Sequence, residues 1–99
     1  MQVLKIQNDK GLERLYTQFI CYPRLYQESV YYFVSGRYYD SEYKRDKEDV
    51  LDSYENPDNA MKECLRLCKL LDKQPDLDDD AYWELVRSLE DDKNDNDSK

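Results

Sequence analysis

The sequence contains no histidine, and its 99 residues include only two glycines, Gly11 and Gly36. Histidine is the commonest general base and a frequent zinc ligand, so its absence excludes Ser-His-Asp and Cys-His catalytic arrangements. Two glycines so far apart cannot build a Gly-rich phosphate-binding loop. No other motif groups carboxylates, lysines or thiols into an active site. The sequence therefore predicts a protein that is not an enzyme and has no catalytic residue, cofactor or metal.

The sequence also lacks long apolar runs and a disulfide framework. No apolar run reaches the roughly 18 residues of a membrane span, and residues 1–10 lack the apolar stretch of a signal peptide. The three cysteines, Cys21, Cys64 and Cys68, are odd in number. Without histidine they cannot complete a four-ligand zinc site, so we expect them to be small buried hydrophobic residues. This cysteine usage favours a reducing compartment, and we expect the protein in the cytoplasm.

Charge is abundant and unevenly distributed. Residues 40–58 contain eight acidic and three basic residues, a net charge of −5, and residues 72–99 contain eleven and four, a net charge of −7. The whole chain has a net charge of −8. Such a protein is repelled by nucleic acid and anionic membranes and attracted to basic protein surfaces. We therefore expect a basic protein surface as partner, and no direct binding to nucleic acid or membrane.

The apolar spacing favours a mainly α-helical fold, a compact bundle of four to five short helices. From Leu12 to Phe19 the apolar residues follow i, i+3, i+4, i+7, which predicts a helix that Pro23 ends. Similar spacing predicts a helix from Asp40 or Ser41 to Tyr54. A small β element stays open near the N-terminus, at 2–7, or at 30–39. We assign residues 1–90 to this single domain and expect 91–99, which contain no apolar residue, to be a disordered acidic tail.

The segment SVYYFVSGRYYDSEY, residues 29–43, allows two interpretations. Its aromatic and β-branched residues favour two strands joined at Ser35-Gly36. However, Tyr31 to Val34 are apolar or aromatic without the alternation of a strand, and Gly36 stands where a helix C-cap is expected. The helical interpretation is favoured here, with the hairpin as the alternative.

The last two helices have the clearest local signals. Asn56 is a good N-cap, Pro57 fits the first helical position, and Asp58 suits the first turn. An apolar stripe from Ala60 to Leu71 follows. After Pro75, one of the aspartates at 76–79 is expected to cap a helix whose apolar side begins at Tyr82.

Tyrosines in excess of the core and clustered carboxylates are the candidate partner-binding residues. Tyrosine provides a rigid contact area with a polar tip and is enriched at recognition surfaces. Carboxylates three or four apart on a helix are about 5–6 Å from each other, a spacing similar to phosphates along a DNA strand. The candidates are Tyr38, Tyr39, Tyr43, Glu42, Asp46, Asp49, Asp76, Asp78, Asp79, Asp80, Trp83 and Glu84.

The sequence from Asp76 to Glu84 also resembles the first half of an EF-hand calcium loop. Aspartates at loop positions 1, 3 and 5 match the oxygen ligands of that loop. Ala81 replaces its glycine, and Arg87 replaces its bidentate glutamate. A degenerate calcium-binding helix–loop–helix is therefore a minor alternative to an acidic helix start.

In bulk properties the chain is similar to anti-restriction and anti-CRISPR proteins of phages and mobile elements, and to immunity proteins of nuclease toxins. The likeness consists of short length, acidity, many aromatics and no catalytic motif. It implies an inhibitor or decoy, acting as a DNA mimic, that binds a basic surface of a nuclease or other nucleic-acid-binding protein. The alternative is a structural or adaptor module that binds through a tyrosine-rich patch.

Overall fold

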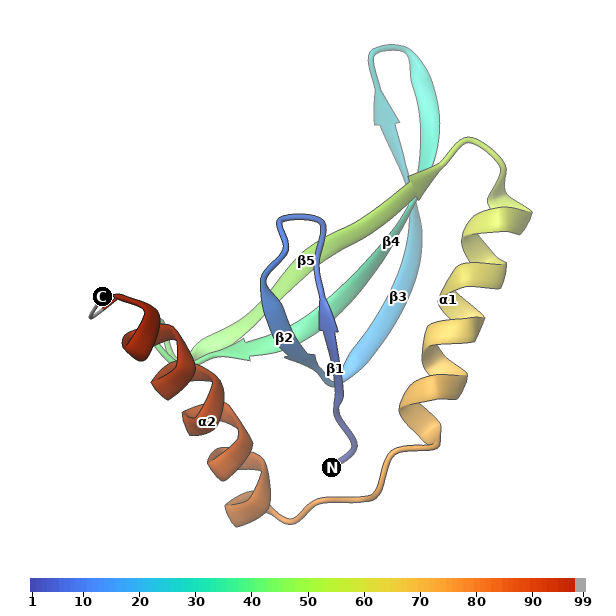
Figure 1. Cartoon of the computed structure of the whole chain (residues 1–99). Coiled ribbons are helices and arrows are strands. Elements are labelled where there is room, and N and C mark those ends of the chain that lie inside the picture. The colour runs from blue at the N-terminus through green and yellow to red at the C-terminus, as the bar shows by residue number, and fades with distance from the viewer. Residues whose placement is uncertain (98–99) are drawn as a thin grey trace.

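The computed structural model describes residues 1–97, with side chains up to residue 89, and shows a predominantly β fold (Figure 1). The expected bundle of four to five helices is therefore wrong, because the described residues form two sheets and two helices. The elements are β1 (Leu4–Gln7), β2 (Glu13–Tyr16), β3 (Gln18–Tyr26), β4 (Ser29–Asp40), β5 (Arg45–Tyr54), α1 (Pro57–Asp72) and α2 (Asp79–Asp97).

The two sheets are antiparallel and lie against each other. Strands β1 and β2 form a hairpin, and the larger sheet has the order β3-β4-β5. In Figure 1 the hairpin crosses one face of the larger sheet, with α1 beside it and α2 on the hairpin's outer side. Contacts of α1 with β3, β4 and β5, of β2 with β4, and of α2 with β2 agree with this arrangement. The β1–β2 hairpin is thus a middle layer with one face toward the larger sheet and one toward α2.

Tyr16 is the centre of the main core. Its side chain is fully buried, and its ring packs 5.8 Å from Phe19 and 6.0 Å from Tyr38, between centroids. The ring lies directly on Gly36 of the central strand β4: a Cβ there would come within 2.5 Å of Tyr16 Cδ1. Gly36 is therefore required by a close side-chain approach, not by a turn or a helix end.

A polar cluster closes the core around Asp49 of β5. Its Oδ2 accepts hydrogen bonds from the Tyr16 hydroxyl (2.8 Å), Arg14 Nε (2.9 Å) and Asn8 Nδ2 (3.2 Å). The Arg14 guanidinium also lies 4.2 Å from the centroid of the Tyr38 ring. Burial and the bond to Asp49 raise the pKa of Tyr16. One inward-facing carboxylate thus joins β5 to β2 and to the β1–β2 turn.

Residues 12–22 are not helical, and burial on two sides explains why their spacing was misleading. Leu15 and Tyr16 are neighbours on β2, so they point to opposite faces of the hairpin. Tyr16 belongs to the main core, whereas Leu15 packs with Val3 and Tyr82 in a second core beneath α2. A strand buried on both faces has consecutive apolar residues, which imitate the pattern of a helix.

Residues 29–40 form β4, so the helix ending at Gly36 is wrong and the strand interpretation is right. The turn, however, is at Gln27-Glu28 and not at Ser35-Gly36. Both turn residues have positive φ, 48° and 69°. This is the geometry of a two-residue type I′ hairpin, which usually selects Asn and Gly. Because the turn residues are Gln and Glu and not Asn and Gly, the sequence did not indicate a turn at this position.

The expected helix over 41–54 is also wrong, because these residues form the β4–β5 turn and β5. Alternation along β5 is obscured because charged Asp49 points inward, and because a bulge opposite Val34 and Ser35 shifts the register. The spacing argument for carboxylates on a helix therefore does not hold for this block.

The last two helix starts are confirmed. Asn56 caps α1 by accepting the Asp58 N–H (2.8 Å), and Pro57 opens the helix. Asp78 Oδ1 accepts the Ala81 N–H (2.8 Å) at the start of α2. Residues 91–97 of the expected tail belong to α2, and residues 98–99 lie outside the described residues, so the disorder of the tail stays a prediction. No helix within residues 1–97 has the length and apolar character needed to cross a membrane.

Candidate protein-interaction surface

Helix α2 has one side packed on the body and one side exposed. Tyr82, which is buried, lies with Val86 and Leu89 against the outer face of the β1–β2 hairpin. The side chains that face solvent include three carboxylates and one cation, Arg87. The exposed carboxylates are those of Asp79, Asp80 and Glu84.

Trp83 directly precedes Glu84, follows Asp80 and Asp79 by three and four residues along α2, and is held in place by two tyrosines. Its ring is 5.2 Å from that of Tyr39 at an interplanar angle of 88°, and 5.1 Å from that of Tyr82 at 70°. Edge-to-face pairs of this kind stabilise a ring beyond its buried area. The indole is nevertheless 37% exposed. The result is a fixed aromatic side chain on an acidic part of the surface.

The β4–β5 turn lies beside this aromatic pair and is organised by Asp40. One oxygen of Asp40 accepts the backbone N–H groups of Glu42 (2.9 Å) and Tyr43 (3.2 Å), and the other is 2.9 Å from Lys47 Nζ. The hydrogen bond from Lys47, supported by the two backbone bonds, lowers the pKa of Asp40. Lys47 Nζ also lies 3.8 Å from the centroid of the Tyr43 ring. Both oxygens of Asp40 are therefore used in bonds that hold the turn, while Glu42 and Tyr43 remain exposed.

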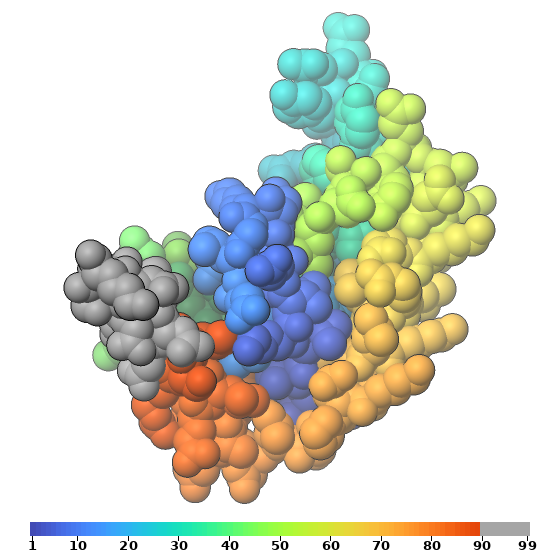
Figure 2. Space-filling model, viewed as in Figure 1, coloured from blue at the N-terminus to red at the C-terminus, as the bar shows by residue number. Residues whose placement is uncertain are grey.

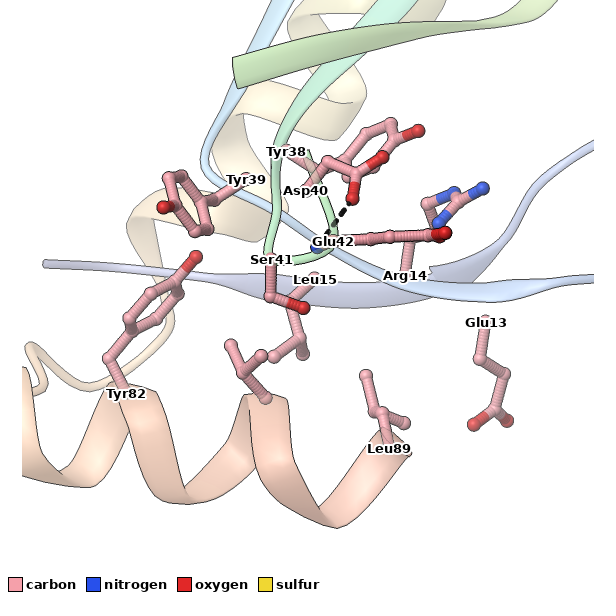
Figure 3. Close-up of a pocket in the computed structure, with 11 residues that line it drawn as sticks. Glu13, Arg14, Leu15, Tyr38, Tyr39, Asp40, Ser41, Glu42, Tyr82 and Leu89 are labelled. Atoms are coloured by element: carbon pink, nitrogen blue, oxygen red, sulfur yellow. Dashed lines mark hydrogen bonds between the residues drawn. The ribbon is translucent and has the colours of Figure 1, made fainter. Parts of the chain in front are cut away.

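A pocket of about 250 Å³ opens between α2, β2 and the β4–β5 turn (Figure 3). In Figure 3 the hydroxyls of Tyr39 and Tyr82 approach each other at one end, and Arg14 and Glu42 lie toward the other. Leu15 and Leu89 line the side near the helix. Its remaining lining residues are Glu13, Tyr38, Asp40, Ser41 and Val86.

The structure brings about half of the predicted partner-binding residues together. Tyr39 and Trp83 are in contact, Tyr39 pairs with Asp46 across β4 and β5, and Asp46 is close enough to contribute to the raised pKa of Tyr82, which burial mainly causes. We name this group the aromatic–acidic surface. It comprises Tyr39, Glu42, Tyr43, Asp46, Trp83 and Glu84.

The other predicted residues lie elsewhere. Tyr38 is buried in the main core, and Asp49 points inward to its three donors. Asp76, Asp78, Asp79 and Asp80 lie at the α1–α2 connection and the first turn of α2, where Asp76 accepts a hydrogen bond from the Met1 amino group and Asp78 caps the helix. Among the described residues, no group of three or more carboxylates or thiols is placed to hold a metal ion, so the calcium-loop likeness gains no support.

Sequence reasoning missed the contribution of β2 to the pocket. Glu13, Arg14 and Leu15 line it because β2 pairs with β1 and α2 packs on that hairpin. Arg14 faces the Asp49 cluster and Leu15 faces α2, so successive side chains of this four-residue strand point to opposite sides. No local signal of that length identifies a pocket wall.

A second exposed feature is the β3–β4 arm, residues 23–30, which extends away from the body (Figures 1 and 2). All its residues are exposed, including the apolar Leu25 (70%) and Val30 (49%). Tyr26 packs edge-on against Tyr31, 6.3 Å between ring centroids. The arm is not covered by either helix and thus exposes apolar side chains on both of its faces.

Comparison of the chain with protein-family models, curated proteins and solved structures finds no match. The function must therefore be argued from the surface itself.

Proposed function

We propose that this protein is a small acidic inhibitor or decoy that binds a basic surface of a nucleic-acid-handling protein, such as a nuclease, through the aromatic–acidic surface. The observation that carries the proposal is the fixed, partly exposed Trp83 on an acidic stretch of α2. Tryptophan is among the residues that most often dominate binding energy at interfaces. Its immobilisation by Tyr39 and Tyr82 means that little side-chain entropy is lost when a partner binds.

The charge distribution supports a basic partner. The chain has a net charge of −8, which speeds association with a cationic surface at low salt. The carboxylates do not form an uninterrupted row like that of a DNA strand, since Asp40, Glu48 and Asp49 are paired with Lys47, Arg37 and Arg14. The proposed decoy therefore acts through an aromatic anchor with flanking carboxylates.

The cytoplasm is the proposed compartment, a choice supported by the three cysteines, which are all free in the structure.

The test is a pull-down of tagged protein from nuclease-treated bacterial lysate at low and high salt, read by mass spectrometry. We expect a nuclease, restriction or CRISPR subunit that is retained at low salt and lost at high salt. The double variant Glu42→Gln/Glu84→Gln and the variant Trp83→Ala should each reduce its retention. The matched control Asp9→Asn/Glu55→Gln makes the same charge change at exposed positions outside the surface. Equal retention by both double variants would contradict the proposal.

A second candidate function, an adaptor module, is favoured by the β3–β4 arm. Its exposed Leu25, Tyr26 and Val30 offer apolar contacts with little charge. Binding through the arm should be nearly independent of salt and lost in Leu25→Ser/Tyr26→Ser. If that variant alone loses the partner, the adaptor function replaces the decoy.

A further inference from the structure

The pocket beneath the β4–β5 turn combines three kinds of wall. Leu15, Val86 and Leu89 make one side apolar. Tyr38, Tyr39 and Tyr82 contribute aromatic rings, and the carboxylates of Glu13, Asp40 and Glu42 lie at the margin (Figure 3). A ligand that fits all three must have an apolar stem and a positively charged end.

Of the three carboxylates that line the pocket among the described residues, two already have a basic partner. Asp40 is bound to Lys47, and Glu13 lies 3.5 Å from Lys5. The positive charge of Arg14 is compensated by Asp49, at 2.9 Å. Glu42 is exposed and lines the pocket, and its bond to Asp40 uses its backbone N–H and leaves its carboxylate out. A cation entering the pocket therefore meets an acidic side chain that is not engaged in holding the turn.

The pocket already contains one example of the expected contact. The Arg14 guanidinium lies over the Tyr38 ring, 4.2 Å from its centroid. Guanidinium groups are attracted to the faces of tyrosine rings, and Tyr39 and Tyr82 also line the pocket. Aliphatic stems of arginine and lysine pack on apolar walls while their charged ends stay near water and carboxylates.

We infer that this pocket receives a basic side chain, arginine or lysine, from the partner protein, with its stem along Leu15 and Leu89 and its charged end at Glu42. The inference rests on the proposed function and specifies how its surface would recognise a basic partner. Trp83 contacts both Tyr39 and Tyr82, which line the pocket, so its fluorescence reports on occupancy.

The test titrates the protein with N-acetyl-arginine methylamide or N-acetyl-lysine methylamide at low salt while Trp83 fluorescence is recorded. N-acetyl-citrulline methylamide, which has the arginine stem without its charge, is the matched ligand control. We expect saturable binding of at least one cationic ligand and at least fivefold weaker binding of the citrulline compound. Glu42→Gln should weaken binding of the cationic ligand about 1.4- to fivefold, the range for one exposed ion pair, whereas Glu55→Gln should leave it unchanged.

Three results would overturn the inference: no saturable change with either cationic ligand, equal binding of the citrulline compound, or equal effects of Glu42→Gln and Glu55→Gln. Nuclear magnetic resonance shifts of the Tyr39 and Tyr82 ring protons give the same answer if fluorescence is insensitive. The outcome is separable from that of the pull-down. A partner retained as proposed without binding of the cationic ligand rejects the pocket inference alone, and ligand binding without a basic-surface partner rejects the proposed function alone.

Discussion

Replacing Gly36 with alanine tests the packing on which this fold depends. The new Cβ would lie 2.5 Å from Tyr16 Cδ1, 2.9 Å from Cγ and 3.0 Å from Cε1. Neither side can easily move away, because β4 is hydrogen-bonded to β3 and β5 and the Tyr16 ring is fully buried between Phe19 and Tyr38. Gly36→Ala is therefore expected to be strongly destabilising.

The magnitude follows from two costs and one gain. Overpacking a buried site costs about 1–3 kcal/mol. If the ring shifts to relieve the contact, its hydrogen bond to Asp49 is lost, which costs about 1.5–3 kcal/mol for a bond to a charged group. Alanine recovers about 0.5–1 kcal/mol of glycine's backbone entropy. We expect the free energy of unfolding to fall by about 1.5–5.5 kcal/mol, a large part of the roughly 5–15 kcal/mol typical of a domain.

Urea unfolding, followed by both circular dichroism and Trp83 fluorescence, measures this change as a lower midpoint with an unchanged slope. Gly11→Ala is the matched control. Gly11 has φ of +78° with no atom within 4 Å of an added Cβ, so only backbone strain of about 1–2 kcal/mol applies there. In a Tyr16→Leu background the cost of Gly36→Ala should shrink markedly, as a double-mutant cycle would show. The reasoning is refuted if Gly36→Ala changes stability by less than about 0.5 kcal/mol.

Two further predictions concern the β3–β4 turn and the thiols. Glu28→Gly should raise the free energy of unfolding by up to about 1 kcal/mol, because it removes a side chain from a residue at φ of 69°, whereas Glu28→Ala should not raise it. The urea unfolding midpoints of the two variants measure this difference. Equal effects of both substitutions would point to the lost charge instead. Burial, with the neighbouring Cys68, raises the pKa of Cys64 from 9.0 to about 11. A pKa higher by about 2 leaves roughly a hundredfold less thiolate at pH 8, so iodoacetamide should label Cys64 far more slowly in the native than in the urea-unfolded protein. Equal labelling rates by mass spectrometry would contradict this.

Local chemistry determined the features that the sequence predicted correctly. Asn56, Pro57 and Asp58 define the start of α1 through bonds within three residues, and Asp78 caps α2 in the same way. The aromatic and acidic character of the candidate surface was also visible, because exposure of Trp83 and Glu84 follows from their place beside the apolar side of an amphipathic helix. Signals of this kind need no partner from elsewhere in the chain.

Tertiary structure alone decided the rest. The spacing of Leu15 and Tyr16 predicts a helix because the two residues are adjacent and both apolar. In the structure each is buried by a different layer, and that arrangement exists only once α2 and the larger sheet enclose the hairpin. Gly36 read as a cap because nothing near it in sequence shows that Tyr16 will lie on it. The sequence predicts Asp49 to be a surface charge, because nothing near it in sequence shows that it will accept hydrogen bonds from Arg14, Tyr16 and Asn8 of the β1–β2 hairpin and its turn. Strand pairing and burial between distant residues set these positions, since a strand takes its stability from neighbours that the local sequence does not contain.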